Sequence, residues 1–170
     1  MRIRHLLCVG LVVAAALSLS STSQASAARC ATGALRAVAL GGQGSAGTFN
    51  AVLRLELRGP GRCTLSGAPG VTLLNGRRRL EIHVIPPRYY GRPPQTVQLY
   101  AHHPTYFNLL YHLAPPAGQK CPSSRITGLS IIPPNDRRAL SVRLRLGDPT
   151  ISLCPGSVAV SPISSERPLS

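Results

Sequence analysis

The sequence is poor in carboxylates and in lysine. Its 170 residues include five Asp and Glu, and Lys120 is the one lysine. With so few acids, neither the paired carboxylates of glycoside cleavage nor the buried acid of a catalytic triad has support. A G-x-S-x-G nucleophile elbow is also absent from the sequence. We therefore expect a protein that is not an enzyme and needs no cofactor.

Metal-binding patterns are weak as well. No two cysteines form the C-x-x-C pair that is typical of structural zinc sites. Neighbouring residues of a strand face opposite sides, so His102 and His103 could share one ion only at a turn, which Pro104 could provide. We favour a surface loop over a metal or acid–base site at this place. Beyond residue 27, the other histidines are His83 and His112, and the tyrosines near this region are Tyr100, Tyr106 and Tyr111.

Long helices are excluded by 16 glycines and 16 prolines that recur along the chain. The dominant period is two, clearest at 49–58 and 139–146, where leucine or valine alternates with arginine, glutamate or serine. This pattern predicts an all-β fold: a single antiparallel β-sandwich of seven to nine strands, immunoglobulin-like in plan. The other predicted strands are 35–40, 71–75, 80–85, 96–100, 105–112, 126–132 and 157–160.

The first 27 residues read as a secretory signal peptide. Arg2 and Arg4 precede an apolar run at 6–19, and Ala25-Ser26-Ala27 forms an A-x-A cleavage site. The run is short for a membrane span, so we expect cleavage rather than anchoring, and no transmembrane anchor later in the chain. The sequence predicts a secreted or cell-wall-associated protein, with one domain at 28–162 and a short flexible tail at 163–170.

The basic excess points to anionic partners outside the cell. Removing residues 1–27 would leave 17 basic and five acidic residues. Export keeps the protein from nucleic acid, so we expect it to bind anionic polymers of the cell envelope. An arginine-rich composition also follows from a GC-rich genome, and a solvated turn is the plainer interpretation. The candidate anion-binding residues are Arg77, Arg78, Arg79, Arg143 and Arg145.

Four cysteines remain after the predicted cleavage, namely Cys30, Cys63, Cys121 and Cys154. An even number in an oxidising compartment predicts two disulfides, and three pairings are possible. We favour Cys30 with Cys63 and Cys121 with Cys154, because each of these pairs closes a contiguous half of the domain.

The loop at 86–94 is a candidate recognition loop. Paired prolines at both ends enclose Arg88, Tyr89, Tyr90 and Arg92, and tyrosine and arginine dominate binding hot spots. A stiff exposed loop on a disulfide-bonded domain is also how a protease inhibitor is built, which makes inhibition the alternative function. A proline-rich connection between strands is the simpler interpretation.

Seven pieces of the chain form a recognisable set: Cys30, GSAGT at 44–48, CTLSGAPGV at 63–71, the region 97–111, Cys121, IPPND at 132–136 and CPG at 154–156. Together they resemble the family of secreted actinobacterial domains termed domain of unknown function 4232. The resemblance implies export, an immunoglobulin-like β-sandwich and no established activity, and it brings no catalytic residues. The family usually has a Pro-Gly-Gly style turn before its later long strand, where this chain has His102-His103-Pro104.

Overall fold

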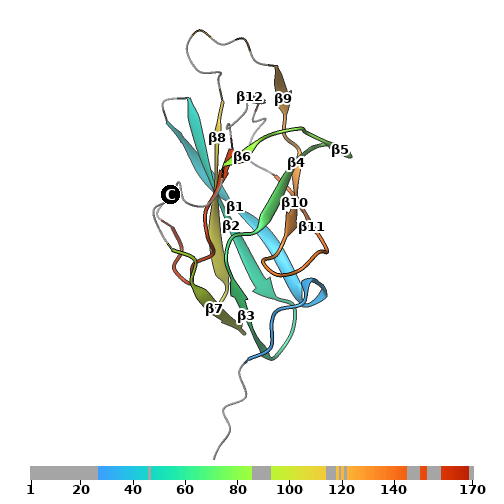
Figure 1. Cartoon of the computed structure of the whole chain (residues 1–170), viewed down its shortest axis with the longest axis vertical. Helices are drawn as coiled ribbons and strands as arrows, with labels where there is room; N and C mark the ends of the chain where they lie inside the picture. Colours follow the sequence, from blue (N-terminus) through green and yellow to red (C-terminus); the bar gives the residue numbers. More distant parts are fainter. Residues whose placement is uncertain are drawn as a thin grey trace, which may run out of the picture.

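Strands make up nearly all of the regular structure, which confirms the all-β prediction (Figure 1). The computed structural model describes residues 27–45, 47–85, 93–113, 118, 120, 122–144, 150–152 and 158–168. Within these ranges the helical structure is one turn, η1 (Thr32–Ala34). The strands are β1 (Leu35–Ser45), β2 (Thr48–Leu57), β3 (Arg62–Ser66), β4 (Gly70–Asn75), β5 (Arg78–Arg79), β6 (Val84–Ile85), β7 (Thr96–Tyr100), β8 (Thr105–His112), β9 (Ser123–Arg125), β10 (Gly128–Ile132), β11 (Leu140–Arg143), β12 (Thr150–Ser152) and β13 (Val158–Val160).

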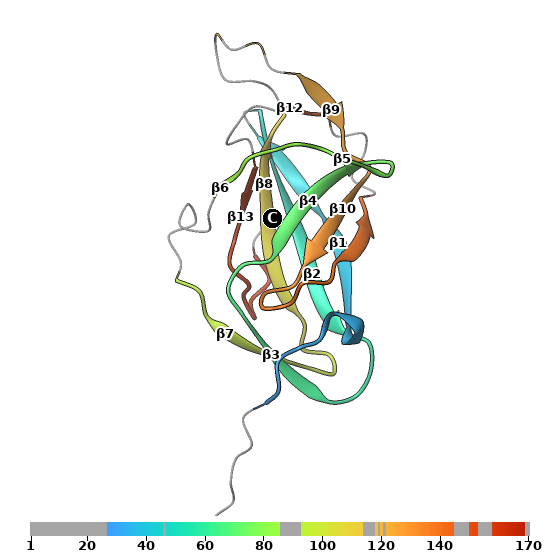
Figure 2. The same ribbon diagram turned by 45° about the vertical axis from the view of Figure 1, so that its right-hand side comes forward.

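Two larger sheets lie on either side of a common core (Figure 2). One has the strand order β1-β2-β8-β13-β6 and the other β11-β10-β4-β5. Two smaller sheets, β3-β7 and β9-β12, lie at opposite ends of the molecule (Figure 1). The pairing is antiparallel except between β13 and β6, which run parallel, so the prediction of a purely antiparallel fold is wrong at that edge.

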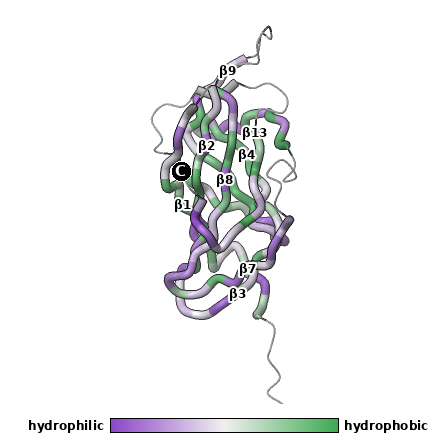
Figure 3. Tube along the Cα trace, turned by 90° about the vertical axis from the view of Figure 1, so that its left-hand side faces the viewer, coloured by the Kyte–Doolittle hydropathy of each residue, from purple (hydrophilic) through white to green (hydrophobic). Residues whose placement is uncertain are grey.

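The alternation read from the sequence decides which side chains enter the core. Leu53 and Leu55 on β2 are fully buried, whereas Arg54 between them is only half-buried. On β8 the buried residues alternate in the same way, because successive side chains of a strand point to opposite faces. Apolar stretches along β4 and β13 are visible in Figure 3. The core therefore draws on the inner faces of both larger sheets.

The predicted strands at 96–100 and 105–112 match β7 and β8 residue for residue. The strand predicted at 80–85 is wrong for its first four residues, because β6 is limited to Val84–Ile85. The strands β3, β5, β9 and β12 were not predicted, and the described residues contain thirteen strands instead of the expected seven to nine.

A disulfide joins Cys30 to Cys63, with Cα atoms 4.9 Å apart, which confirms the first predicted pair. The same segment also pairs with β3: the Thr64 N–H donates to Ala28 O at 2.9 Å, and the Cys30 N–H donates to Thr64 O at 3.0 Å. Cys121 and Cys154 lie outside the described residues, so the second disulfide stays a prediction. The proposed signal peptide also lies outside them, apart from Ala27.

The packed part of the chain runs further than the predicted boundary at residue 162. Ile163 is buried, and its N–H donates to Gly67 O at 2.9 Å. Ser164 pairs with Tyr106 through two backbone hydrogen bonds of 2.8 Å. The tail that was expected from residue 163 therefore begins no earlier than residue 165.

Asp136 joins the loop between β10 and β11 to η1. Its Oδ2 accepts hydrogen bonds from the Thr32 N–H at 2.8 Å and the Thr32 hydroxyl at 2.5 Å. Its Oδ1 accepts from the N–H groups of Arg137 at 2.6 Å and Arg138 at 3.2 Å. Four donors on one carboxylate hold the pKa of Asp136 well below its usual 3.8, and the Thr32 hydroxyl contributes most.

Replacing both Cys30 and Cys63 by alanine should lower the free energy of unfolding by about 3–4 kcal/mol, because the disulfide closes a long loop in the unfolded chain. Urea unfolding of the double variant and of the parent measures this difference. The matched control is a variant with Cys121→Ala and Cys154→Ala, which removes the predicted second disulfide and leaves the Cys30–Cys63 bond intact. A loss of under about 1 kcal/mol in the Cys30 and Cys63 variant would contradict the stabilising role of this bond.

Asp136 should make the domain less stable at acid pH. A carboxyl group whose pKa is lowered by folding stabilises the folded state above its unfolded pKa of 3.8, and that contribution is lost as pH falls below it. The thermal midpoint of the parent should therefore fall more steeply below about pH 4 than that of Asp136→Asn. Glu166→Gln, at an exposed position, should follow the parent; equal slopes for all three proteins would refute the assignment.

Candidate anion-binding face

The β4–β5 hairpin brings the three consecutive arginines onto the smaller main sheet. Leu74 pairs with Arg79 and Asn75 pairs with Arg78, so the turn between the strands is only Gly76 and Arg77. Gly76 has φ of 59°, a left-handed conformation that glycine adopts without steric cost. Arg78 and Arg79 belong to the strand β5.

Thr127 holds this turn against the start of β10. Its hydroxyl accepts a hydrogen bond from the Gly76 N–H at 2.7 Å and donates to Leu74 O at 3.2 Å. The Thr127 N–H also donates to Leu74 O, and its carbonyl accepts from the Leu144 N–H at 3.2 Å. One threonine thereby fixes the positions of the turn, β10 and the end of β11 relative to one another.

Arg79 and Arg143 lie on the same outer face of this sheet. Arg79 pairs with Leu74, Leu74 with Gly128, and Gly128 with Arg143, which gives one row across four strands. Directly paired residues of antiparallel strands project from the same face. At a strand spacing of about 4.8 Å, the two arginine Cα atoms are about 14 Å apart. Gly128 has no side chain to fill the space between them.

Arg77 and Arg143 also line one hollow of about 720 Å³. Thr127 and Ser141 add polar groups to its wall, and none of its lining residues is acidic. Arg77, Arg79, Ser141 and Arg143 are all exposed. We call these four residues the basic face.

Arg77, Arg79 and Arg143, which the sequence put forward as anion-binding residues, thus lie together in the basic face, and their binding role stays a prediction. Arg78 is exposed but pairs with Asn75 in the neighbouring register position, so it projects from the other face of the sheet. Arg145 lies outside the described residues. Ser141 was expected to face outward, but its place beside the hairpin turn depends on strand order, which the sequence did not reveal. Thr127 and Gly128 were missed, although a glycine inside a predicted strand is a sign of close backbone approach.

The histidines do not gather into a metal site. Among the described residues, no group of three or more His, Cys, Asp or Glu side chains could hold an ion. His103 stacks on Tyr100, and Tyr111 is buried in the core, where desolvation raises its pKa to about 12. A buried, protonated phenol is unavailable to a surface acid–base site.

The recognition loop cannot be placed against these features. Arg88, Tyr89, Tyr90 and Arg92 all lie outside the described residues, so the predicted role of the loop and protease inhibition both stay predictions.

A family model described as a domain of unknown function, DUF4232, matches residues 30–164. The chain belongs to this family. The match agrees with the resemblance drawn from Cys30, the CTLSGAPGV segment and the IPPND segment. No curated protein and no solved structure matches the chain significantly. The whole basic face lies within the matched residues 30–164.

Gly128→Ala should destabilise the DUF4232 domain. A Cβ atom at this position would lie 2.8 Å from the Val142 carbonyl oxygen, so β10 and β11 would have to separate. Overpacking of this kind costs about 1–3 kcal/mol, measurable by urea unfolding. Ser141→Ala, an exposed neighbour in the same hollow, should change stability by no more than about 0.5 kcal/mol. Equal free energies of unfolding for the two variants would show that the close approach of Gly128 to the Val142 carbonyl does not affect stability.

Proposed function

We propose that the protein is an exported, non-catalytic module that binds anionic polymers of the cell envelope through the basic face. The observation that carries the proposal is the gathering of Arg77, Arg79 and Arg143 on one side of one sheet. None of the residues lining the hollow beside them is acidic, so no carboxylate there competes with an incoming anion.

The spacing of these arginines favours a polymer over a small ion. A guanidinium group pairs bidentately with a phosphate or carboxylate group. One exposed ion pair contributes only about 0–1 kcal/mol, and salt screens it. A polymer that carries a charge at each repeat can engage several arginines at once, so that the individually weak contacts add up.

Two further features support an envelope location. The N-terminal residues have the pattern of a signal peptide, and the Cys30–Cys63 disulfide is compatible with an extracellular protein. In the part of the chain that the structure describes, no helix is long and apolar enough to cross a membrane.

We also propose an immunoglobulin-like plan for the module. Two sheets that enclose one core, with β2 and β8 antiparallel in one and β4 and β10 antiparallel in the other, support it. In such a plan the outer face of a sheet is open to a partner while its inner face holds the core. The basic face lies on such an outer face.

Salt should release the protein from cells that export it. Cells washed at about 1 M NaCl should lose the bound protein to the wash, because the Debye length falls to about 3 Å. The variant Arg77→Ser, Arg79→Ser and Arg143→Ser should appear in the culture fluid at low salt, with an unchanged thermal midpoint. Immunoblots of cell-bound and released fractions measure both results.

The matched control removes the same charge from other places. Arg137, Arg138 and Arg167 are exposed, and the first two lie in the loop at the far end of β10 and β11 from Arg143. Their replacement by serine should leave most of the protein on the cells. Equal release of both triple variants would show that net charge alone acts, and retention of the parent at high salt would refute electrostatic binding.

A further inference from the structure

The two-stranded sheet β3-β7 has one buried and one exposed face. Cys63 and Leu65 of β3, with Val97 and Leu99 of β7, are buried against the core. The opposite face is polar apart from one aromatic ring, that of Tyr100, which pairs directly with Arg62. Tyr100 is 42 % exposed, and the other exposed large apolar side chain among the described residues is Leu113. An aromatic ring therefore stands at the surface beside an arginine.

The ring of Tyr100 is held in place. His103 stacks on one side of it, with ring centroids 3.9 Å apart, and the His103 N–H donates to Tyr100 O at 3.0 Å. The turn between them places His102 at φ of 64°, a left-handed conformation that is uncommon outside glycine. Such outliers persist where the surroundings fix them, and they cluster at ligand sites. A fixed ring loses little conformational entropy when a ligand stacks on it.

Two hollows meet at Tyr100 and Ala101. The first, of about 270 Å³, is lined by Arg36, Glu56, Arg58 and His102, among others. The second, of about 450 Å³, is lined by Arg62 and Gln98. Gln98 and Tyr100 are two residues apart on β7, so their side chains project from the same face. We call the two hollows together the Tyr100 groove.

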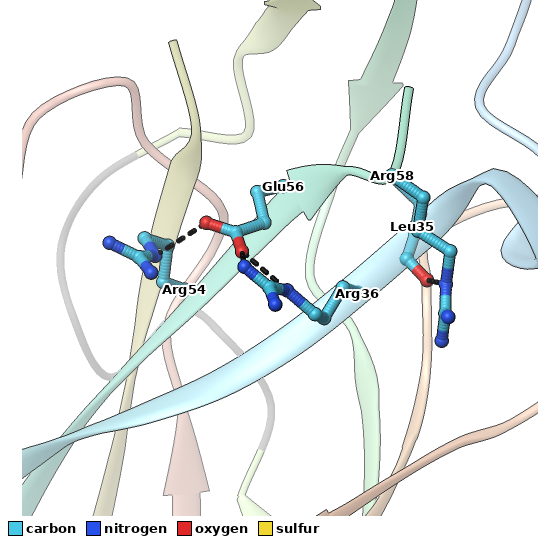
Figure 4. A network of polar contacts seen from close by, with 5 residues as sticks. All are labelled: Leu35, Arg36, Arg54, Glu56 and Arg58. Carbon is cyan, nitrogen blue, oxygen red and sulfur yellow. Dashed lines mark hydrogen bonds and ion pairs between the residues drawn. The ribbon is translucent and has the colours of Figure 1, made fainter. Parts of the chain in front are cut away.

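The charges of the first hollow are arranged for an anion (Figure 4). Glu56 lies between two arginines: the Arg36 Nε–H donates to Oε1 at 2.6 Å, and Arg54 Nε lies 2.9 Å from Oε2 as an ion pair without hydrogen-bond geometry. This carboxylate is thus already compensated. The Arg58 Nε–H donates to Leu35 O at 2.7 Å, which fixes the guanidinium plane and leaves its terminal amino groups for another acceptor.

We propose that the Tyr100 groove binds a negatively charged sugar unit. The sugar ring would stack on the exposed part of Tyr100, Gln98 would bond its hydroxyl groups, and Arg58 or Arg62 would pair with its carboxylate or phosphate. At about 30 Å³ per water, the first hollow has room for roughly nine waters, enough for one sugar ring. This site is separate from the basic face, since Arg77 and Arg143 line a different hollow.

Titration of the purified exported protein, followed by ¹H–¹⁵N NMR at about 0.15 M salt, tests the proposal. The probes are tetragalacturonate, glucose 6-phosphate and the neutral cellotetraose. Tetragalacturonate or glucose 6-phosphate should shift the resonances of Gln98, Tyr100 and Arg62, and whichever binds identifies the anionic group as carboxylate or phosphate. Equal binding of cellotetraose, or no binding of either charged sugar, would overturn the proposal.

Variants separate this site from the basic face. Tyr100→Ala should weaken binding about three- to tenfold, while Tyr100→Phe keeps most of it, because the ring and not the hydroxyl makes the contact. Replacing Arg77, Arg79 and Arg143 by serine should leave this binding unchanged, whatever that variant does to retention on cells. Since Tyr100 is exposed, Tyr100→Ala should keep the parent's thermal midpoint. Unchanged affinity in a folded Tyr100→Ala variant would overturn the assignment.

Discussion

The pairing of β2 with β8 is the constraint on which the rest of the molecule depends. Its register runs from Thr48 opposite His112 to Leu55 opposite Thr105 without a shift. That register sends Leu53 and Phe107 to the same side, where they meet the inner face of the second sheet. A slip of one residue would turn the apolar side chains of the slipped strand away from the core.

The few acidic residues explain why so much positive charge is left at the surface. Glu56 is compensated by Arg36 and Arg54, and Asp136 is occupied by hydrogen bonds from Thr32 and two backbone N–H groups. Both carboxylates are thus engaged within the domain. The arginines of the basic face lie beside a hollow without an acidic lining residue, and Arg58 and Arg62 line the Tyr100 groove.

Local patterns in the sequence predicted local features well. Alternation predicted the buried and exposed residues of β11 and the burial of Leu53 and Leu55 on β2, although Ala51 and Val52 are buried beside Leu53 and break the alternation there. The cysteine positions suggested the Cys30–Cys63 bond. The order of the strands in the sheets could not be predicted from the sequence. Gly128, for example, pairs with Arg143 and Leu74, which lie in other segments of the chain. The Tyr100 groove depends on the same kind of pairing. The residues of β5 were interpreted as part of a turn, because three consecutive arginines show no alternation of apolar and polar side chains.

The position of β13 sets the order in which the fold can be completed. This strand, Val158–Val160, comes from the last part of the chain, yet it lies inside the larger sheet between β8 and β6. Until it arrives, β8 has an unpaired edge of backbone N–H and carbonyl groups, and such edges recruit other strands. A chain that crosses a membrane from its N-terminus would therefore fold only after nearly all of it has emerged, and it would need protection from aggregation during that interval.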